Sequence, residues 1–105
     1  MTAEQFDEAT WRLVEWHTDA GHGWLRVPLE LVEPARDKIS GYSYKDNEFA
    51  YLEEDCDAWA FLDYWGMRSM VDAFDEVDDG RDSPIRHKQP WPQSASWRPP
   101  FERRV

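Results

Sequence analysis

The first quarter of the chain alternates between short apolar stretches and turn-forming residues. Residues 11–17 and 24–27 are rich in tryptophan, valine and leucine, as is typical of β-strands. The segment 19–23 between them holds two glycines, which tolerate the backbone angles of a tight turn. The pattern predicts an antiparallel hairpin, preceded by a short capped helical turn over residues 2–9.

The following stretch predicts a short helix and a second hairpin. Pro28 suits the first turn of a helix, and Pro34 limits that helix to about one or two turns. Residues 39–44 alternate as in a strand, and residues 49–52 form a second apolar run. Turn-forming residues separate these two runs, so we expect the second hairpin to return directly into the acidic segment that follows.

A longer helix is expected after the second hairpin. Its apolar positions recur at the spacing of one helix face, and they are Ala58, Phe61, Leu62 and Trp65. Either Asp55 or Asp57 is expected to cap the start of this helix, and Gly66 to interrupt it. A short amphipathic stretch over 67–74 should then end in the acidic residues 75–80.

These elements predict an α+β fold, in which two hairpins form a small antiparallel sheet with helices packed on one face. The composition changes at residue 81, where a basic segment rich in proline and tryptophan begins. Such a segment favours extended or polyproline conformation. We therefore expect an acidic α+β domain over residues 1–80 and a basic tail over residues 81–105, docked on the body or on a partner.

The charge of the chain is large and unevenly distributed. The 105 residues carry a formal net charge of −10, of which residues 1–80 contribute −14 and residues 81–105 contribute +4. A body of this sign repels nucleic acid and anionic membranes and attracts basic partners. The acidic N-terminus does not resemble a signal peptide, no stretch suits a membrane span, and one cysteine fits a reducing cytoplasm.

Four carboxylates surround Cys56 within residues 53–57. They should raise the pKa of the thiol, which favours a structural cysteine over a nucleophile. Clustered carboxylates can bind hard cations, but the order of acids found in calcium-binding loops is absent, so neither a metal ion nor a cofactor is predicted. One alternative is a small enzyme or metal-binding protein that uses His17, His22, Asp55 and Cys56, which requires folding to bring them together.

Three segments, His22–Pro28, Tyr42–Tyr44 and Tyr51–Ala58, resemble those of a family of small uncharacterised bacterial, phage and plasmid proteins. The resemblance rests on an HGW-type turn and an EEDCD-type segment and covers residues 11–62. The family has no established activity, so the resemblance implies a mobile-element context and a bacterial cytoplasm. Small acidic proteins of such origin often bind host proteins, as anti-CRISPR and anti-restriction proteins do.

The charge distribution and this context predict a non-enzymatic acidic protein that binds, and so can inhibit, a basic nucleic-acid-handling protein of the host. Spaced carboxylates on a rigid scaffold can imitate a phosphate backbone. The predicted contacts are two acidic clusters and two tryptophans expected to be exposed: Glu53, Glu54, Asp55, Asp57, Asp75, Glu76, Asp78, Asp79, Trp91 and Trp97. A third hypothesis is a homo-oligomeric structural protein, such as a homodimer, in which the basic tail of one copy covers the acidic body of another.

Overall fold

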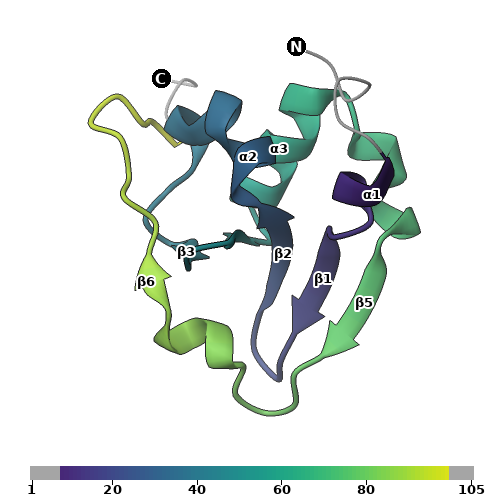
Figure 1. The fold of residues 1–105 in the computed structure, drawn as a ribbon. Helices are drawn as coiled ribbons and strands as arrows, with labels where there is room; N and C mark the ends of the chain where they lie inside the picture. Colours follow the sequence, from purple (N-terminus) through teal and green to yellow (C-terminus); the bar gives the residue numbers. More distant parts are fainter. Residues whose placement is uncertain (1–7, 100–105) are drawn as a thin grey trace.

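The computed structural model describes residues 8–99, which form an α+β fold around one six-stranded sheet (Figure 1). The strands are β1 (Glu15–Thr18), β2 (Gly23–Pro28), β3 (Tyr44–Lys45), β4 (Phe49–Glu53), β5 (Asp75–Asp78) and β6 (Gln89–Pro90). The helices are α1 (Glu8–Trp11), α2 (Leu29–Val32) and α3 (Asp57–Trp65), with 3₁₀ segments η2 (Glu33–Lys38), η3 (Arg68–Ala73) and η4 (Pro84–His87). Within residues 8–99, no helix is long and apolar enough to cross a membrane.

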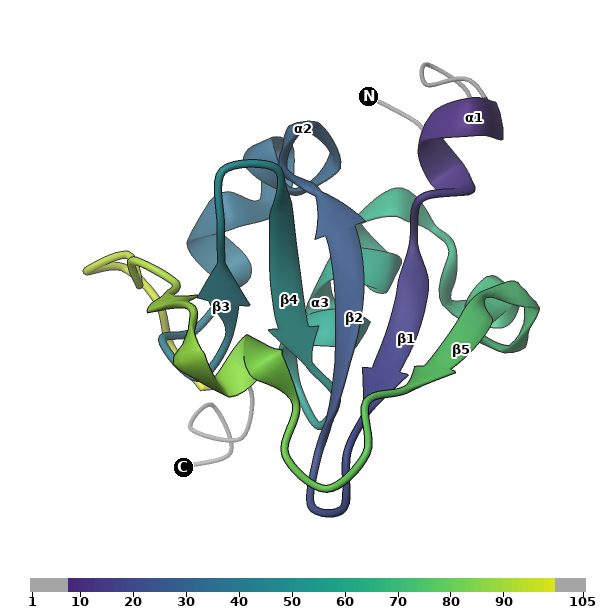
Figure 2. The ribbon, with the colours of Figure 1, turned by 60° about the horizontal axis from the view of Figure 1, so that its bottom comes forward.

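Both predicted hairpins are present, and they join through their inner strands in the order β5-β1-β2-β4-β3-β6. In the first hairpin, β1 runs antiparallel to β2 with Trp16 opposite Leu25. The turn is fixed by Asp19, whose side chain accepts hydrogen bonds from the backbone N–H groups of Gly21 at 3.0 Å and His22 at 2.9 Å. Figure 2 shows α3 behind this sheet, on the same side as α2.

The sheet is mixed, whereas the sequence predicts a purely antiparallel one. The difference is β5, which pairs with β1 in parallel. The pattern predicts that residues 75–80 end a helical stretch, but residues 75–78 are this edge strand. Their backbone groups find hydrogen-bond partners in β1, while the acidic side chains remain exposed and Val77 is half-buried. Pairing with a strand about 60 residues earlier thus overrides the local pattern.

Two predicted strands are shorter in the structure. Trp11 ends α1, and the strand predicted to begin there starts at Glu15. Residues 39–43 form a loop, and only Tyr44 and Lys45 pair with β4. The loop leaves the sheet because two of its serines turn inward to a buried carboxylate, as described below. The helical turn predicted over residues 2–9 lies largely outside the described residues.

The core lies between the sheet and α3. As predicted, the buried face of α3 consists of Ala58, Phe61, Leu62 and Trp65. The indole N–H of Trp65 donates a 2.8 Å hydrogen bond to the carbonyl of Leu31, which ties α3 to α2. The helix ends at Gly66, whose φ of 69° lies in the left-handed region that glycine adopts without strain.

The described part of the tail, residues 81–99, completes the sheet. Its strand β6 pairs antiparallel with β3, and the backbone N–H of Trp91 donates to the carbonyl of Ser43 at 2.8 Å. The Trp91 side chain is 8% exposed and packs in the main core. The prediction of an exposed Trp91 is therefore wrong, because the pairing of β6 turns this residue inward.

Candidate functional site

The acidic segment 53–57 joins β4 to α3, and Glu53 organises the junction. One carboxylate oxygen of Glu53 accepts a hydrogen bond from the N–H of Asp55 at 2.9 Å, and the other accepts one from the N–H of Asp57 at 2.8 Å. N–H groups in the first turn lack partners within the helix, and the side chain of Cys56 at the N-cap position makes no capping bond. The prediction that Asp55 or Asp57 caps α3 is therefore wrong, because Glu53 does so from the preceding strand.

Asp57 is fully buried and fastens the loop 39–43 to α3. Its Oδ2 atom accepts hydrogen bonds from the N–H of Ser40 at 2.9 Å, and from the hydroxyl groups of Ser40 and Ser43 at 2.6 Å each. Burial raises the pKa of Asp57, and the serine hydrogen bonds oppose that increase. Asp57 is thus a structural residue, and its predicted role as a partner contact is wrong because partners cannot reach it.

Cys56 is half-buried beside the same carboxylates. Burial raises the pKa of its thiol, and the charges of Asp57, Glu53 and Asp55 raise it further. Ligand atoms of Glu53, Cys56 and Asp57 lie within 4.8 Å of one another, and thiolate with carboxylate is a donor set that zinc accepts. Hydrogen bonds from the chain occupy both carboxylate oxygens of Glu53 and the Oδ2 atom of Asp57. Among the described residues, the buried Oδ1 atom of Asp57 has no hydrogen-bond partner. The raised pKa disfavours the thiolate that a nucleophile needs, so these surroundings favour a structural Cys56.

We expect Cys56 to react slowly with Ellman's reagent, because only the thiolate reacts and the raised pKa makes it scarce. At about pH 7.5 the rate should be lower than that of glutathione. In denaturant the two thiols should react at similar rates. Asp55→Asn, which removes an exposed charge beside the thiol, should react faster than the parent protein. A folded protein that reacts as fast as glutathione would contradict the expectation.

The two histidines of the enzyme alternative lie in different surroundings. His17 is held on β1, with Nε2 2.8 Å from a carboxylate oxygen of Glu15 and Nδ1 3.1 Å from one of Asp79. His22 lies in the turn, stacks on Trp24 and accepts a hydrogen bond from Arg86 at Nδ1. Only His22 lines the same hollow as Asp55 and Cys56. The predicted set of four therefore does not assemble as one site.

The two acidic clusters do meet at one place. A hollow of about 290 Å³ is lined by Glu54 in the turn after β4, Asp72 in η3 and Glu76 in β5. Between them lie apolar side chains, namely those of Trp16, Val71 and Phe74. The indole N–H of Trp16 donates to the carbonyl of Val71 at 3.1 Å, which fixes the floor. Among residues 8–99, no basic side chain forms an ion pair with the three carboxylates.

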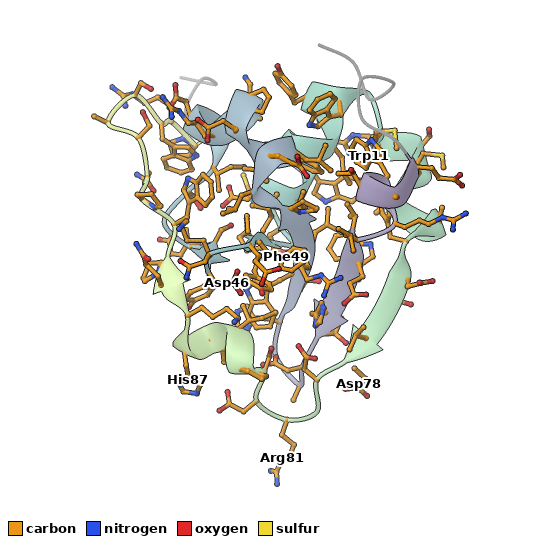
Figure 3. All side chains as sticks on the ribbon, viewed as in Figure 1. Trp11, Asp46, Phe49, Asp78, Arg81 and His87 are labelled. Atoms are coloured by element: carbon orange, nitrogen blue, oxygen red, sulfur yellow. The ribbon has the colours of Figure 1, made fainter. Side chains whose placement is uncertain are left out.

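The other predicted contacts differ in exposure. Asp75 and Asp78 are exposed on β5, and the outer edge of this strand pairs with no strand of the described chain. Asp78 lies on the outside of the molecule at the end of the strand (Figure 3). Asp79 instead turns towards His17 and accepts a 2.6 Å hydrogen bond from the hydroxyl of Ser83, so it stabilises the fold. Trp97 is half-buried.

Sequence reasoning missed several residues of these hollows. Asp72 precedes the acidic residues 75–80 and is not among the predicted contacts. Trp16 and Arg86 have no sequence feature that links them to either hollow. Arg86 is 67 positions from Asp19, yet its Nε atom is 2.6 Å from the buried Asp19 carboxylate. This hydrogen bond holds the pKa of Asp19 well below its ordinary value. Only the path of the tail across the sheet brings the two together.

No protein-family model, curated protein or solved structure matches this chain. The resemblance carried by the HGW-type turn and the EEDCD-type segment thus gains no support from these comparisons.

Proposed function

We propose that the protein is a non-enzymatic binding protein whose partner is a basic, nucleic-acid-handling protein. The observation that carries the proposal is the acid-rimmed hollow formed by Glu54, Asp72 and Glu76 around an apolar floor. Protein interfaces commonly combine an apolar centre with a polar rim. Carboxylates without a cation of their own favour a partner that supplies lysine or arginine.

The adjoining edge strand extends the charged surface. Asp75 and Asp78 add two exposed carboxylates on β5, the strand that also carries Glu76. The outer edge of β5, which pairs with no strand within residues 8–99, offers backbone groups to a partner strand. A net charge of −10 would draw a basic partner in from a distance and repel nucleic acid itself. By occupying a basic groove, such a surface would compete with the phosphates that the groove normally binds, as an anti-CRISPR or anti-restriction protein does.

This proposal places the protein in a bacterial cytoplasm, in a phage or mobile-element context, and requires no cofactor or metal ion. The alternative of a homodimer through the tail is less well supported, because β6 pairs with β3 of its own chain and Trp91 fills its own core. The enzyme alternative is weakened by the separation of His17 from His22, Asp55 and Cys56.

Neutralising the hollow should weaken partner binding in a salt-sensitive way. The triple variant Glu54→Gln, Asp72→Asn, Glu76→Gln is expected to bind the partner about three- to tenfold more weakly, and the parent's affinity should fall as salt rises. Proteins captured from a bacterial lysate are identified by mass spectrometry. The purified partner is then titrated with the parent protein and with each variant. The binding of the partner to nucleic acid is measured in the presence and in the absence of the parent protein.

The matched control changes the charge by the same amount elsewhere. Glu30→Gln, Glu33→Gln, Asp37→Asn neutralises three exposed carboxylates on α2 and η2. It should leave the affinity within about twofold of the parent. An equal loss of affinity in both triple variants would mean that only the net charge matters, not the hollow. A captured partner that is acidic would refute the proposal. So would a partner that binds nucleic acid equally well with and without this protein.

A further inference from the structure

A second hollow, of about 540 Å³, lies where the HGW-type turn, the Tyr42–Tyr44 segment and the β4–α3 junction meet the tail. Its walls include four aromatic side chains and two acids, namely Trp24, Tyr42, Tyr44, Trp97, Glu53 and Asp55. A volume of this size accommodates one large side chain or a small ligand. The segments that carry the family resemblance therefore converge on a single hollow.

The aromatic walls suit a weakly hydrated cation. Trp24 and Tyr44 meet edge to face, with ring centroids 6.5 Å apart, and Tyr42 is 78% exposed at the mouth. The faces of such rings attract guanidinium and ammonium groups. The fold itself uses this attraction here, because the guanidinium of Arg86 lies 5.3 Å from the ring centroid of Trp24.

The charges of the hollow also favour a cation. Among the residues 8–99 that line it, the one guanidinium is that of Arg86, which is matched by the buried carboxylate of Asp19 with contacts of 2.6 and 2.9 Å. The same guanidinium lies 3.0 Å from Nδ1 of His22, to which it donates a hydrogen bond. The hollow also contains the carboxylates of Glu53 and Asp55. No basic side chain among residues 8–99 forms an ion pair with either of them.

We propose that this hollow receives one arginine side chain of the basic partner, an inference that rests on the proposed function. Arginine fits better than lysine because its planar, weakly hydrated guanidinium stacks on aromatic rings and bonds carboxylates at its edge. Trp97 and Tyr42 would flank the guanidinium plane, and Asp55 at the rim would accept its N–H groups. Glu53 would contribute charge while keeping its hydrogen bonds to the start of α3.

The test is a titration of the full-length protein with Nα-acetyl-arginine amide, followed by NMR of the tryptophan indole N–H signals. Nα-acetyl-citrulline amide, which has the same shape without the charge, is the matched ligand and should bind about tenfold more weakly. Trp97→Ala should weaken arginine binding about five- to tenfold, and Asp55→Asn about threefold. Glu76→Gln, which removes one charge at the other hollow, should change it less than twofold.

The outcomes separate this inference from the proposed function. Equal affinity for the arginine and citrulline probes, or unchanged binding in Trp97→Ala, overturns the arginine site even if the partner is still captured through the acid-rimmed hollow. An arginine probe that binds here but does not compete with the captured partner also overturns it, since the hollow would then serve a free small cation. Failure to capture any basic partner refutes the proposed function, whatever the titration shows.

Discussion

Replacing Asp57 with alanine is expected to lower the free energy of unfolding by about 3–5 kcal/mol. The substitution removes the acceptor of three hydrogen bonds, two from serine hydroxyl groups and one from the backbone of Ser40. All of these donors are buried, so water cannot replace the lost acceptor without opening the structure. Urea denaturation followed by tryptophan fluorescence measures the loss, and the loop 39–43 should lose protection from hydrogen exchange.

The neighbouring acid provides the control. Asp55→Ala removes an exposed carboxylate two positions away and should change the free energy of unfolding by less than about 0.5 kcal/mol. Similar losses in both variants would mean that the effect comes from the acidic segment as a whole. A loss below about 1 kcal/mol in Asp57→Ala would show that the serines find other acceptors.

The stability of the parent protein should also depend on pH through Asp57. Its pKa is raised in the folded state above the ordinary value of 3.8, so the folded protein binds its proton more tightly than the unfolded chain does. This contribution favours folding at pH below 3.8 and is lost as the pH rises through the folded pKa. Asp57→Asn has no titratable group at this position. The free energy of unfolding of the parent, measured relative to this variant, should therefore fall as the pH rises from 3.8 through the folded-state pKa of Asp57.

Trp91→Ala is expected to cost about 3 kcal/mol of unfolding free energy. The side chain is 8% exposed and packs against the main core, so truncation leaves a cavity between the tail and the body. The pairing of β6 with β3 should weaken as well. The backbone N–H of Trp91 is hydrogen-bonded to the carbonyl of Ser43, and the loss of the side-chain packing would loosen this contact. Thermal unfolding and hydrogen exchange of β3 and β6 report these two effects separately.

Trp97→Ala is the matched control for Trp91. Trp97 is half-buried in the same tail, and its truncation should cost less than about 1 kcal/mol. Equal losses at the two positions would mean that the tail docks by general apolar contact. A Trp91→Ala variant as stable as the parent would show that the tail contributes little to the fold.

Some features of the fold follow from local sequence alone. The hairpin turn at Asp19 and the left-handed end of α3 at Gly66 depend on residues with special backbone or side-chain chemistry. The buried face of α3 follows from the helical spacing of four apolar residues. Each of these features is specified within a few positions, so a single sequence is enough to predict them.

Other features depend on contacts between distant segments. The strand character of residues 75–78 arises from pairing with β1, and the inward turn of Trp91 arises from pairing with β3. The loop 39–43 adopts its path because Ser40 and Ser43 reach a carboxylate 14 to 17 positions away. Local composition indicates a helix end at residues 75–78, an exposed Trp91 and a strand over residues 39–43, and contacts between distant segments outweigh these local preferences.

By itself, the sequence determined an acidic α+β fold with two hairpins and one amphipathic helix, because periodicity, turn residues and net charge are local or additive properties. The tertiary structure decided which carboxylates face solvent. It buried Asp57 and turned Asp79 towards His17, and it brought Glu54 beside Asp72 and Glu76. The physical reason is that a carboxylate's environment depends on the segments packed around it, and neither spacing nor composition records which segments those are.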